Sequence, residues 1–174
     1  MAESSAPIAV SSTVPAAGAR QARRALAVTL AVTIAYALLA AFGLRWALAQ
    51  GIASPTWPAA GVALAVLVMA GPRHAPAIVL GYVLAALFGG SPQPSWVIAT
   101  VAVGNMLSAL GAWWVLRRLH FAPRFEAFRD FVVFVGAATL AATFASTIGA
   151  VAIGLASPAG TPSVLMWAHW FLGD

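Results

Sequence analysis

The sequence contains no cysteine and no lysine, and only 7% of its 174 residues are charged. Without cysteine, the chain has no disulfide framework, no thiolate metal site and no cysteine nucleophile. An ordinary soluble domain has about 25% charged residues, so the charges of this chain are too few to cover a soluble globule. Soluble enzymes, secreted disulfide scaffolds and disordered proteins are therefore disfavoured.

Hydrophobic residues make up 62% of the chain, and the mean hydropathy is +0.93. This composition predicts an all-α fold, a polytopic bundle of transmembrane helices with the lipid bilayer as its partner. The 9 arginines outnumber the 4 acidic residues, and a basic chain can indicate a nucleic-acid partner. The arginines, however, stand in small groups at the ends of apolar segments. That pattern is typical of membrane orientation, so we expect no nucleic acid.

Apolar segments predict about five full membrane spans and part of a sixth. A helix of about 20 apolar residues crosses the hydrocarbon core. Residues 1–24 are interpreted as a disordered cytoplasmic tail and residues 25–174 as one integral membrane domain. The predicted spans are residues 25–44, a second segment from 56 to 70, residues 75–88, 96–116 and 131–156, and a helix that begins near Pro162.

The first segment has a rival interpretation as a cleaved signal peptide, because Ala47, Leu48 and Ala49 resemble a cleavage site. A secretory apolar region has about 7–15 residues, and this segment is longer. More apolar segments also follow it. The chain therefore favours a membrane span here.

The second and third segments are short for membrane spans. A single re-entrant hairpin would place Arg73 near the bilayer centre, at a cost of several kcal/mol without a partner. Two short spans with Arg73 at a water interface are therefore preferred. Thr56 is the expected N-cap of the second helix, Pro58 fits its first turn and Ser95 is the expected cap of the fourth.

Two further local patterns stand out in the second half of the chain. Residues 120–130 mix charged side chains with phenylalanines, which predicts a loop with a short interfacial helix. In the fifth span, small residues recur every four positions, which allows two helices to approach closely, although a chain rich in alanine shows such repeats anyway. These residues are Ala137, Ala141, Ala145 and Gly149.

The arginines also predict the orientation. With the N-terminus in the cytoplasm, eight of the 9 arginines lie inside and only Arg45 lies outside, in accord with the positive-inside rule. The outer interface would then contain Trp46, Trp57, Trp96 and Trp167. From Pro162 to Asp174 the sixth helix would rise about 18 Å, about halfway through the membrane, so we expect the intact protein to continue.

Polar groups at depth are candidate functional residues in a membrane protein. Asn105 and Asp174 are predicted at similar depths, where an amide and a carboxyl group can hydrogen-bond. The alternative role of Asn105 is helix–helix contact, worth about 0.6–2 kcal/mol. His169, with Trp167 and Trp170, is expected either to line an outward-facing pocket or to anchor the helix at the interface. His169 and Asp174 lie about 140° apart around one helix, so no metal site is expected.

Several segments resemble the MASE1 family of membrane-associated sensor domains. Residues 57–65 resemble its W-P-x-x-G-[IV]-A-L-A signature, and residues 71–81 resemble its G-x-R-x-x-P turn and the helix that follows. Further similarities are Gly104-Asn105, residues 116–118, Arg129-Asp130, and residues 167–174 to the W-x-x-W-x-[LV]-G-D segment. These pieces occur in the family's order over residues 26–174.

The resemblance implies a bacterial sensory module of the inner (plasma) membrane, which precedes a histidine kinase or a cyclic-di-GMP enzyme. It implies a C-terminally incomplete domain, because such bundles contain more helices than this one. No catalytic motif and no cofactor are expected in this segment, and a homodimer would form through the full-length protein. The signal would be an unknown small molecule or a partner membrane protein. The candidate ligand-binding residues are Trp57, Pro58, Asn105, Trp167, His169, Trp170 and Asp174.

Two other functions stay open from the residues alone. Short spans interrupted by glycine and proline also occur in transporters, and an intramembrane Asp174 could carry protons or cations in a small transporter or channel component. A purely structural membrane anchor is the third hypothesis.

Overall fold

The computed structural model describes residues 14–50, 54, 56–157 and 164–174 of the chain. All of the regular structure in these residues is helical, which confirms the predicted all-α class. The elements are α1 (Val14–Gln50), α2 (Pro58–Ala70), the 3₁₀ helix η1 (Pro72–His74), α3 (Pro76–Phe88), α4 (Ser95–Arg118), α5 (Phe128–Ala156) and α6 (Val164–Gly173).

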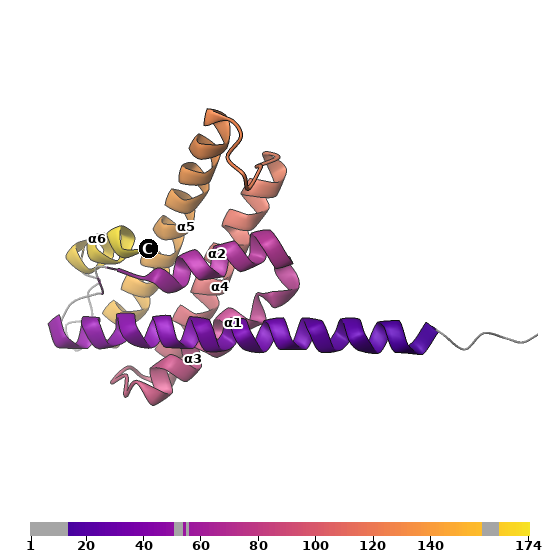
Figure 1. Cartoon of the computed structure of the whole chain (residues 1–174). Helices are drawn as coiled ribbons and strands as arrows, with labels where there is room; N and C mark the ends of the chain where they lie inside the picture. The colour runs from indigo at the N-terminus through magenta and orange to yellow at the C-terminus, as the bar shows by residue number, and fades with distance from the viewer. Residues whose placement is uncertain (1–13, 51–53, 55, 158–163) are drawn as a thin grey trace, which may run out of the picture.

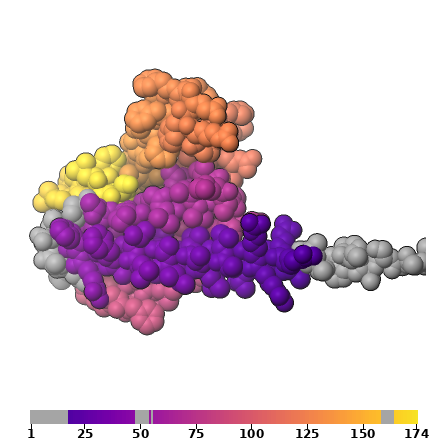
Figure 2. Space-filling view, in the orientation of Figure 1, coloured from indigo at the N-terminus to yellow at the C-terminus, as the bar shows by residue number. Residues whose placement is uncertain are grey.

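The long helix α1 forms one side of the bundle, and its N-terminal part projects beyond the other helices (Figure 1). The space-filling view shows this projection as a single rod beside the packed region (Figure 2). Helix α2 runs back along α1, α3 then runs in the same direction as α1, and α4 pairs with α5. Helix α6 packs on α5 near the start of α2.

Three helices are long and apolar enough to cross a membrane, at Gly18–Ala47, Ser95–Arg118 and Phe128–Ala156. Helices α2 and α3 have 13 residues each, or about 20 Å at 1.5 Å per residue, against about 30 Å of hydrocarbon. The expectation of five full spans is therefore confirmed for three helices, and α2 and α3 are shorter apolar helices. Large apolar side chains such as Leu38 and Leu140, 68% and 62% exposed, face outward from the long helices.

The turn between α2 and α3 lies at the arginine-rich end of the apolar part of α1. Helix α2 starts at Trp57, which packs against Gly43, and its far end leads to His74, which contacts Thr29. Gly43 and Thr29 are about 21 Å apart along α1. Arg73 therefore lies near the end of the bundle, as the preference for two short spans over a central hairpin requires.

Hydrogen bonds define the protonation state of His74, which is only 1% exposed. The Thr29 hydroxyl donates to the Ala25 carbonyl (3.0 Å), so it accepts from Nδ1–H of His74 (2.9 Å). The other ring nitrogen, Nε2, accepts from Nε–H of Arg73 (3.1 Å). This network requires the neutral Nδ1–H tautomer, which fastens the α2–α3 turn to α1.

Close helix approach depends on small residues. A Cβ atom at Gly81 on α3 would lie 2.9 Å from the Thr33 carbonyl oxygen on α1, so only glycine fits there without a shift. In α5, Ala137, Ala145 and Gly149 are buried and Ala141 is half-buried. The four-residue repeat predicted from the sequence therefore lies on the packed face of α5.

Several predicted boundaries differ from the structure. Trp57, not Thr56, is the N-cap of α2, while Pro58 is in the first turn as predicted. Ser95 is the first residue of α4 rather than its cap. Helix α1 begins at Val14, inside the predicted tail. Pro162, the predicted start of the sixth helix, lies outside the described residues.

The predicted short interfacial helix within residues 120–130 is wrong, since residues 119–127 form turns and α5 begins at Phe128. The physical reason is Asp130, which is 4% exposed. Its carboxylate accepts the backbone N–H groups of Ala122 and Ala127, both at 3.3 Å. A carboxylate that binds loop N–H groups in this way stabilises turns in place of a helix.

Substitution of Gly81 tests the contact between α1 and α3. We expect Gly81→Ala to lower the free energy of unfolding by about 1–3 kcal/mol, because the added methyl group overpacks the contact. Gly111 on α4 has open space around its Cα, so Gly111→Ala is the control and should be neutral or slightly stabilising. Equal effects of the two substitutions on unfolding in detergent would contradict the contact.

Substitution of Thr29 tests the His74 network. Thr29→Val keeps the shape of the side chain but leaves the buried Nδ1–H without an acceptor, which costs about 1–3 kcal/mol. The matched control is Thr143→Val, since the exposed Thr143 hydroxyl bonds only the Thr139 carbonyl of its own helix. Unfolding monitored by circular dichroism should show a lower free energy of unfolding for Thr29→Val and no change for Thr143→Val.

Candidate functional site

The end of α6 meets the start of α2 through a backbone hydrogen bond. The N–H group of Trp57 donates to the carbonyl oxygen of Gly173 at 2.7 Å. Trp57 precedes α2, and Pro58 is the first residue of α2. Gly173 is the last residue of α6, and Asp174 follows it. Two motifs more than a hundred positions apart in the sequence are therefore joined at one point of the bundle.

The side chain of Trp57 is part of the protein core. It is 7% exposed, it packs over Gly43, and its ring centroid lies 6.1 Å from that of Tyr82. Because α1 and α3 enclose the indole, Trp57 does not face lipid, and its level at the outer membrane interface stays a prediction. Trp46 and Trp96 are 47% and 48% exposed, as interfacial side chains are.

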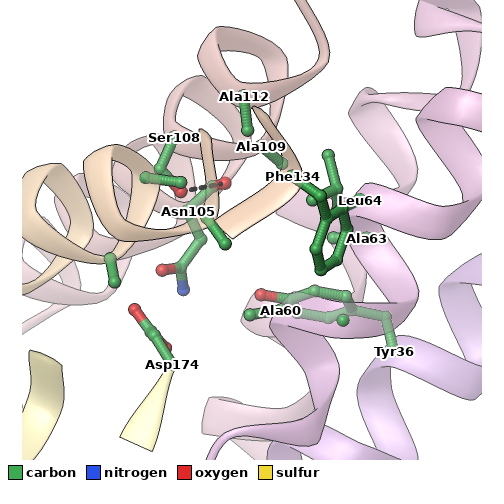
Figure 3. A pocket seen from close by; sticks show the side chains of 14 residues that line it. Tyr36, Ala60, Ala63, Leu64, Asn105, Ser108, Ala109, Ala112, Phe134 and Asp174 are labelled. Atoms are coloured by element: carbon green, nitrogen blue, oxygen red, sulfur yellow. Dashed lines mark hydrogen bonds between the residues drawn. The ribbon is translucent and has the colours of Figure 1, made fainter. Parts of the chain in front are cut away.

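A cavity of about 190 Å³ lies beside this junction, between α1, α2, α4, α5 and the end of the chain. Most of its wall is apolar. Figure 3 shows that the Tyr36 hydroxyl, the Asn105 amide and the Asp174 carboxyl group point toward the same space. The lining residues are Tyr36, Ala60, Gly61, Ala63, Leu64, Asn105, Ser108, Ala109, Ala112, Phe134, Ala138, Ala141, Ala142 and Asp174.

Three buried polar atoms at or near the cavity have no hydrogen-bond partner among the described residues. They are Nε1 of Trp57, Nδ2 of Asn105 and Oδ1 of Asp174. The predicted proximity of Asn105 and Asp174 is confirmed, since both line the cavity, but the structure shows no hydrogen bond between them. Each buried group that stays unpartnered costs about 1–3 kcal/mol, so these groups call for a hydrogen-bond partner such as a water or a ligand.

Three of the predicted site residues make other contacts. Nε1–H of Trp167 donates to the Thr147 hydroxyl at 3.0 Å. Nδ1 of His169 hydrogen-bonds the Leu165 carbonyl of its own helix at 2.8 Å. Trp170 packs against Gly149, where no side chain would fit. These contacts attach α6 to α5 or stay within α6, and none of the three residues is among those lining the cavity.

The remaining predicted residue, Pro58, is exposed in the first turn of α2 and does not line the cavity. Sequence reasoning also missed Tyr36, which is 1% exposed. A tyrosine in the middle of an apolar span places a hydroxyl group at depth, and this signal could have identified it. Ser108, one turn after Asn105, donates its hydroxyl to the Asn105 carbonyl at 3.0 Å.

Comparison with known proteins identifies the family of the chain. The MASE1 family profile matches residues 28–174. The chain belongs to the MASE1 family. It is a multi-pass membrane sensor domain, and MASE1 domains are non-catalytic. No curated protein and no solved structure matches the chain.

The family's sequence segments converge in the structure of this MASE1 domain. The W-P segment at Trp57 and the G-D segment at Gly173 are hydrogen-bonded, and Asn105 of the G-N pair lines the same cavity as Asp174. Within the described ranges, no group of three His, Cys, Asp or Glu side chains is placed to hold a metal ion.

Substitution of Gly149 tests how α6 is held. A leucine at position 149 would collide with the Trp170 ring and should displace α6 from α5. Because the chain has no cysteine, Thr147→Cys with Trp167→Cys and a short bis-maleimide reports this contact. We expect efficient cross-linking in the variant that carries only the two cysteines. Adding Gly149→Leu should lower the cross-linked fraction at least fivefold. The control Gly136→Leu changes an open position of α5 and should preserve cross-linking.

Proposed function

We propose that this MASE1 domain is the input module of a bacterial signalling protein that binds a small molecule in the cavity beside Asp174. The bound molecule favours one arrangement of the helices, and this arrangement controls a cytoplasmic output domain of the histidine kinase or cyclic-di-GMP type. The supporting observation is the pair of buried, unpartnered polar atoms, Nδ2 of Asn105 and Oδ1 of Asp174, on residues that line one mostly apolar cavity.

The position of the cavity suits a switch. Its wall is formed by residues from four helices and the chain end, so a ligand that contacts several of them stabilises their joint arrangement. A ligand shifts such an equilibrium only through its different affinities for the two states. The unpartnered atoms of Asn105 and Asp174 would supply this difference if a ligand could bond both of them in only one of the two arrangements.

Helix α6 is the element best placed to transmit the change. None of its residues is fully buried, and its Trp167 side chain hydrogen-bonds the Thr147 hydroxyl on α5. Its end includes Gly173, bonded to Trp57, and it leads directly to Asp174 in the cavity wall. Movement of Asp174 toward or away from a ligand therefore moves α6 relative to α2.

The proposed setting is the bacterial inner membrane, with the N-terminus in the cytoplasm. This orientation places eight of the 9 arginines on the cytoplasmic side. The turn at Arg73 and the arginines at the end of α4, Arg117 and Arg118, would then lie near the output domain. In the full-length protein, output domains of this kind would act as a homodimer.

Substitution of the cavity's polar groups tests this proposal. In a protein in which the domain is joined to a diguanylate cyclase, Asn105→Leu and Asp174→Leu should each change the cellular cyclic-di-GMP level at least fivefold, the lower end of ordinary coupling energies. The first substitution removes the amide and the second removes the carboxyl group that would bind the ligand.

The matched controls replace the same chemical groups away from the cavity. Gln93→Leu removes an amide outside the helices, and Glu126→Leu removes an exposed carboxylate. Both should leave the cyclic-di-GMP level within twofold of the parent at equal membrane abundance. If the cavity variants behave like these controls, the cavity is not part of the switch.

A further inference from the structure

We infer that the ligand of the cavity is a small uncharged alcohol, a hydroxyl group on an apolar body of about eight non-hydrogen atoms in total. This inference rests on the proposed function, because it names the chemical class that the same site would take. It follows from the size of the cavity, the chemistry of its two unpartnered side chains, and the absence of a cationic side chain among the described lining residues.

The cavity limits the size of the ligand. Its volume is about 190 Å³, whereas an engineered apolar cavity of about 150 Å³ binds benzene, and a single water occupies about 30 Å³. One water bridging Asn105 and Asp174 would leave most of the space empty. A molecule slightly larger than benzene fills it, which corresponds to about eight non-hydrogen atoms.

The polar groups select the head of the ligand. Nδ2 of Asn105 needs an acceptor and Oδ1 of Asp174, as a carboxylate, needs a donor. Asn105 is 7% exposed, so bulk water does not satisfy it. A hydroxyl group accepts and donates through one oxygen atom. An ammonium group only donates and a carboxylate only accepts, so each leaves one of the two protein atoms unpartnered.

Charge argues against an anionic ligand. The described lining contains no arginine and no histidine beside Asp174, so an anionic ligand would be repelled and left without a counter-charge. A hydroxyl group also fits either protonation state of Asp174, since it accepts a hydrogen bond from a protonated carboxyl group. The neutral head therefore binds without a charged partner in a low-dielectric site.

The remaining wall favours an apolar body. Alanines from α2, α4 and α5 form much of it, together with Leu64 and Phe134. Figure 3 shows the Tyr36 and Phe134 rings on the side of the cavity opposite Asp174. A flat ring or a short branched chain with its hydroxyl toward Asp174 satisfies both ends of the cavity.

The test compares three probes of nearly equal size and different charge: benzyl alcohol, benzylamine and benzoate. Equilibrium dialysis of the chain in lipid nanodiscs measures saturable binding, and empty nanodiscs correct for partition into lipid. We expect benzyl alcohol to bind at least tenfold more tightly than benzylamine or benzoate. Asn105→Leu and the cavity-filling Ala109→Leu should each weaken its binding at least tenfold.

Asp174→Asn is the decisive variant, because it removes the charge and keeps an oxygen acceptor. We expect it to bind benzyl alcohol within about threefold of the parent, whereas an amine ligand would lose most of its affinity. Should Asn105→Leu fail to fold, Asn105→Ala with the same probes replaces it. Gly111→Ala, at an open position on the same helix, is the control that should bind normally.

The outcomes separate this inference from the proposed function. Tighter binding of benzylamine, lost in Asp174→Asn, would overturn the alcohol class and leave a ligand-binding cavity in place. No saturable binding of any probe, or binding unchanged by Ala109→Leu, would overturn the inference as well. The proposed function is decided separately by the cyclic-di-GMP measurements on Asn105→Leu and Asp174→Leu, which use no added probe.

Discussion

The hydrogen bond from Trp57 N–H to the Gly173 carbonyl joins the start of α2 to the end of α6. In a membrane, an unpaired backbone group costs several kcal/mol because no water is present to satisfy it. Trp57 is the N-cap of α2 and is followed by Pro58, which has no N–H of its own. The chain end thus satisfies a free group at the start of α2, and this contact brings Asp174 to the cavity.

Polar residues in this domain fall into two groups with different physical roles. His74 and Asp130 are buried and fully engaged: His74 bonds Thr29 and Arg73, and Asp130 bonds two loop N–H groups. They fasten the turns of the bundle. Trp57, Asn105 and Asp174 each keep a buried atom without a described partner. Satisfied groups stabilise the fold, whereas the unsatisfied groups of Asn105 and Asp174, which line one cavity, are the basis of the proposed ligand site.

Small residues determine how closely the helices approach. Gly81 lets α3 lie against the backbone of α1, and Gly149 leaves room for the Trp170 ring between α5 and α6. Without a hydrophobic driving force between helices in lipid, such close packing is a main source of association energy. The same alanine-rich packing leaves the wall of the cavity apolar and smooth, which restricts recognition to a few polar atoms.

The sequence by itself determined the class of this protein. Its low charge, apolar segments and grouped arginines predicted a membrane helix bundle, and its motifs predicted the MASE1 family. The rise per residue of a helix placed Asn105 and Asp174 at similar depths. Only the tertiary structure decided that Tyr36 joins them, that Trp57 is enclosed by α1 and α3, and that His169 bonds within α6. The reason is that periodicity defines the faces of one helix, whereas the neighbour that covers each face depends on close contacts between segments far apart in the chain.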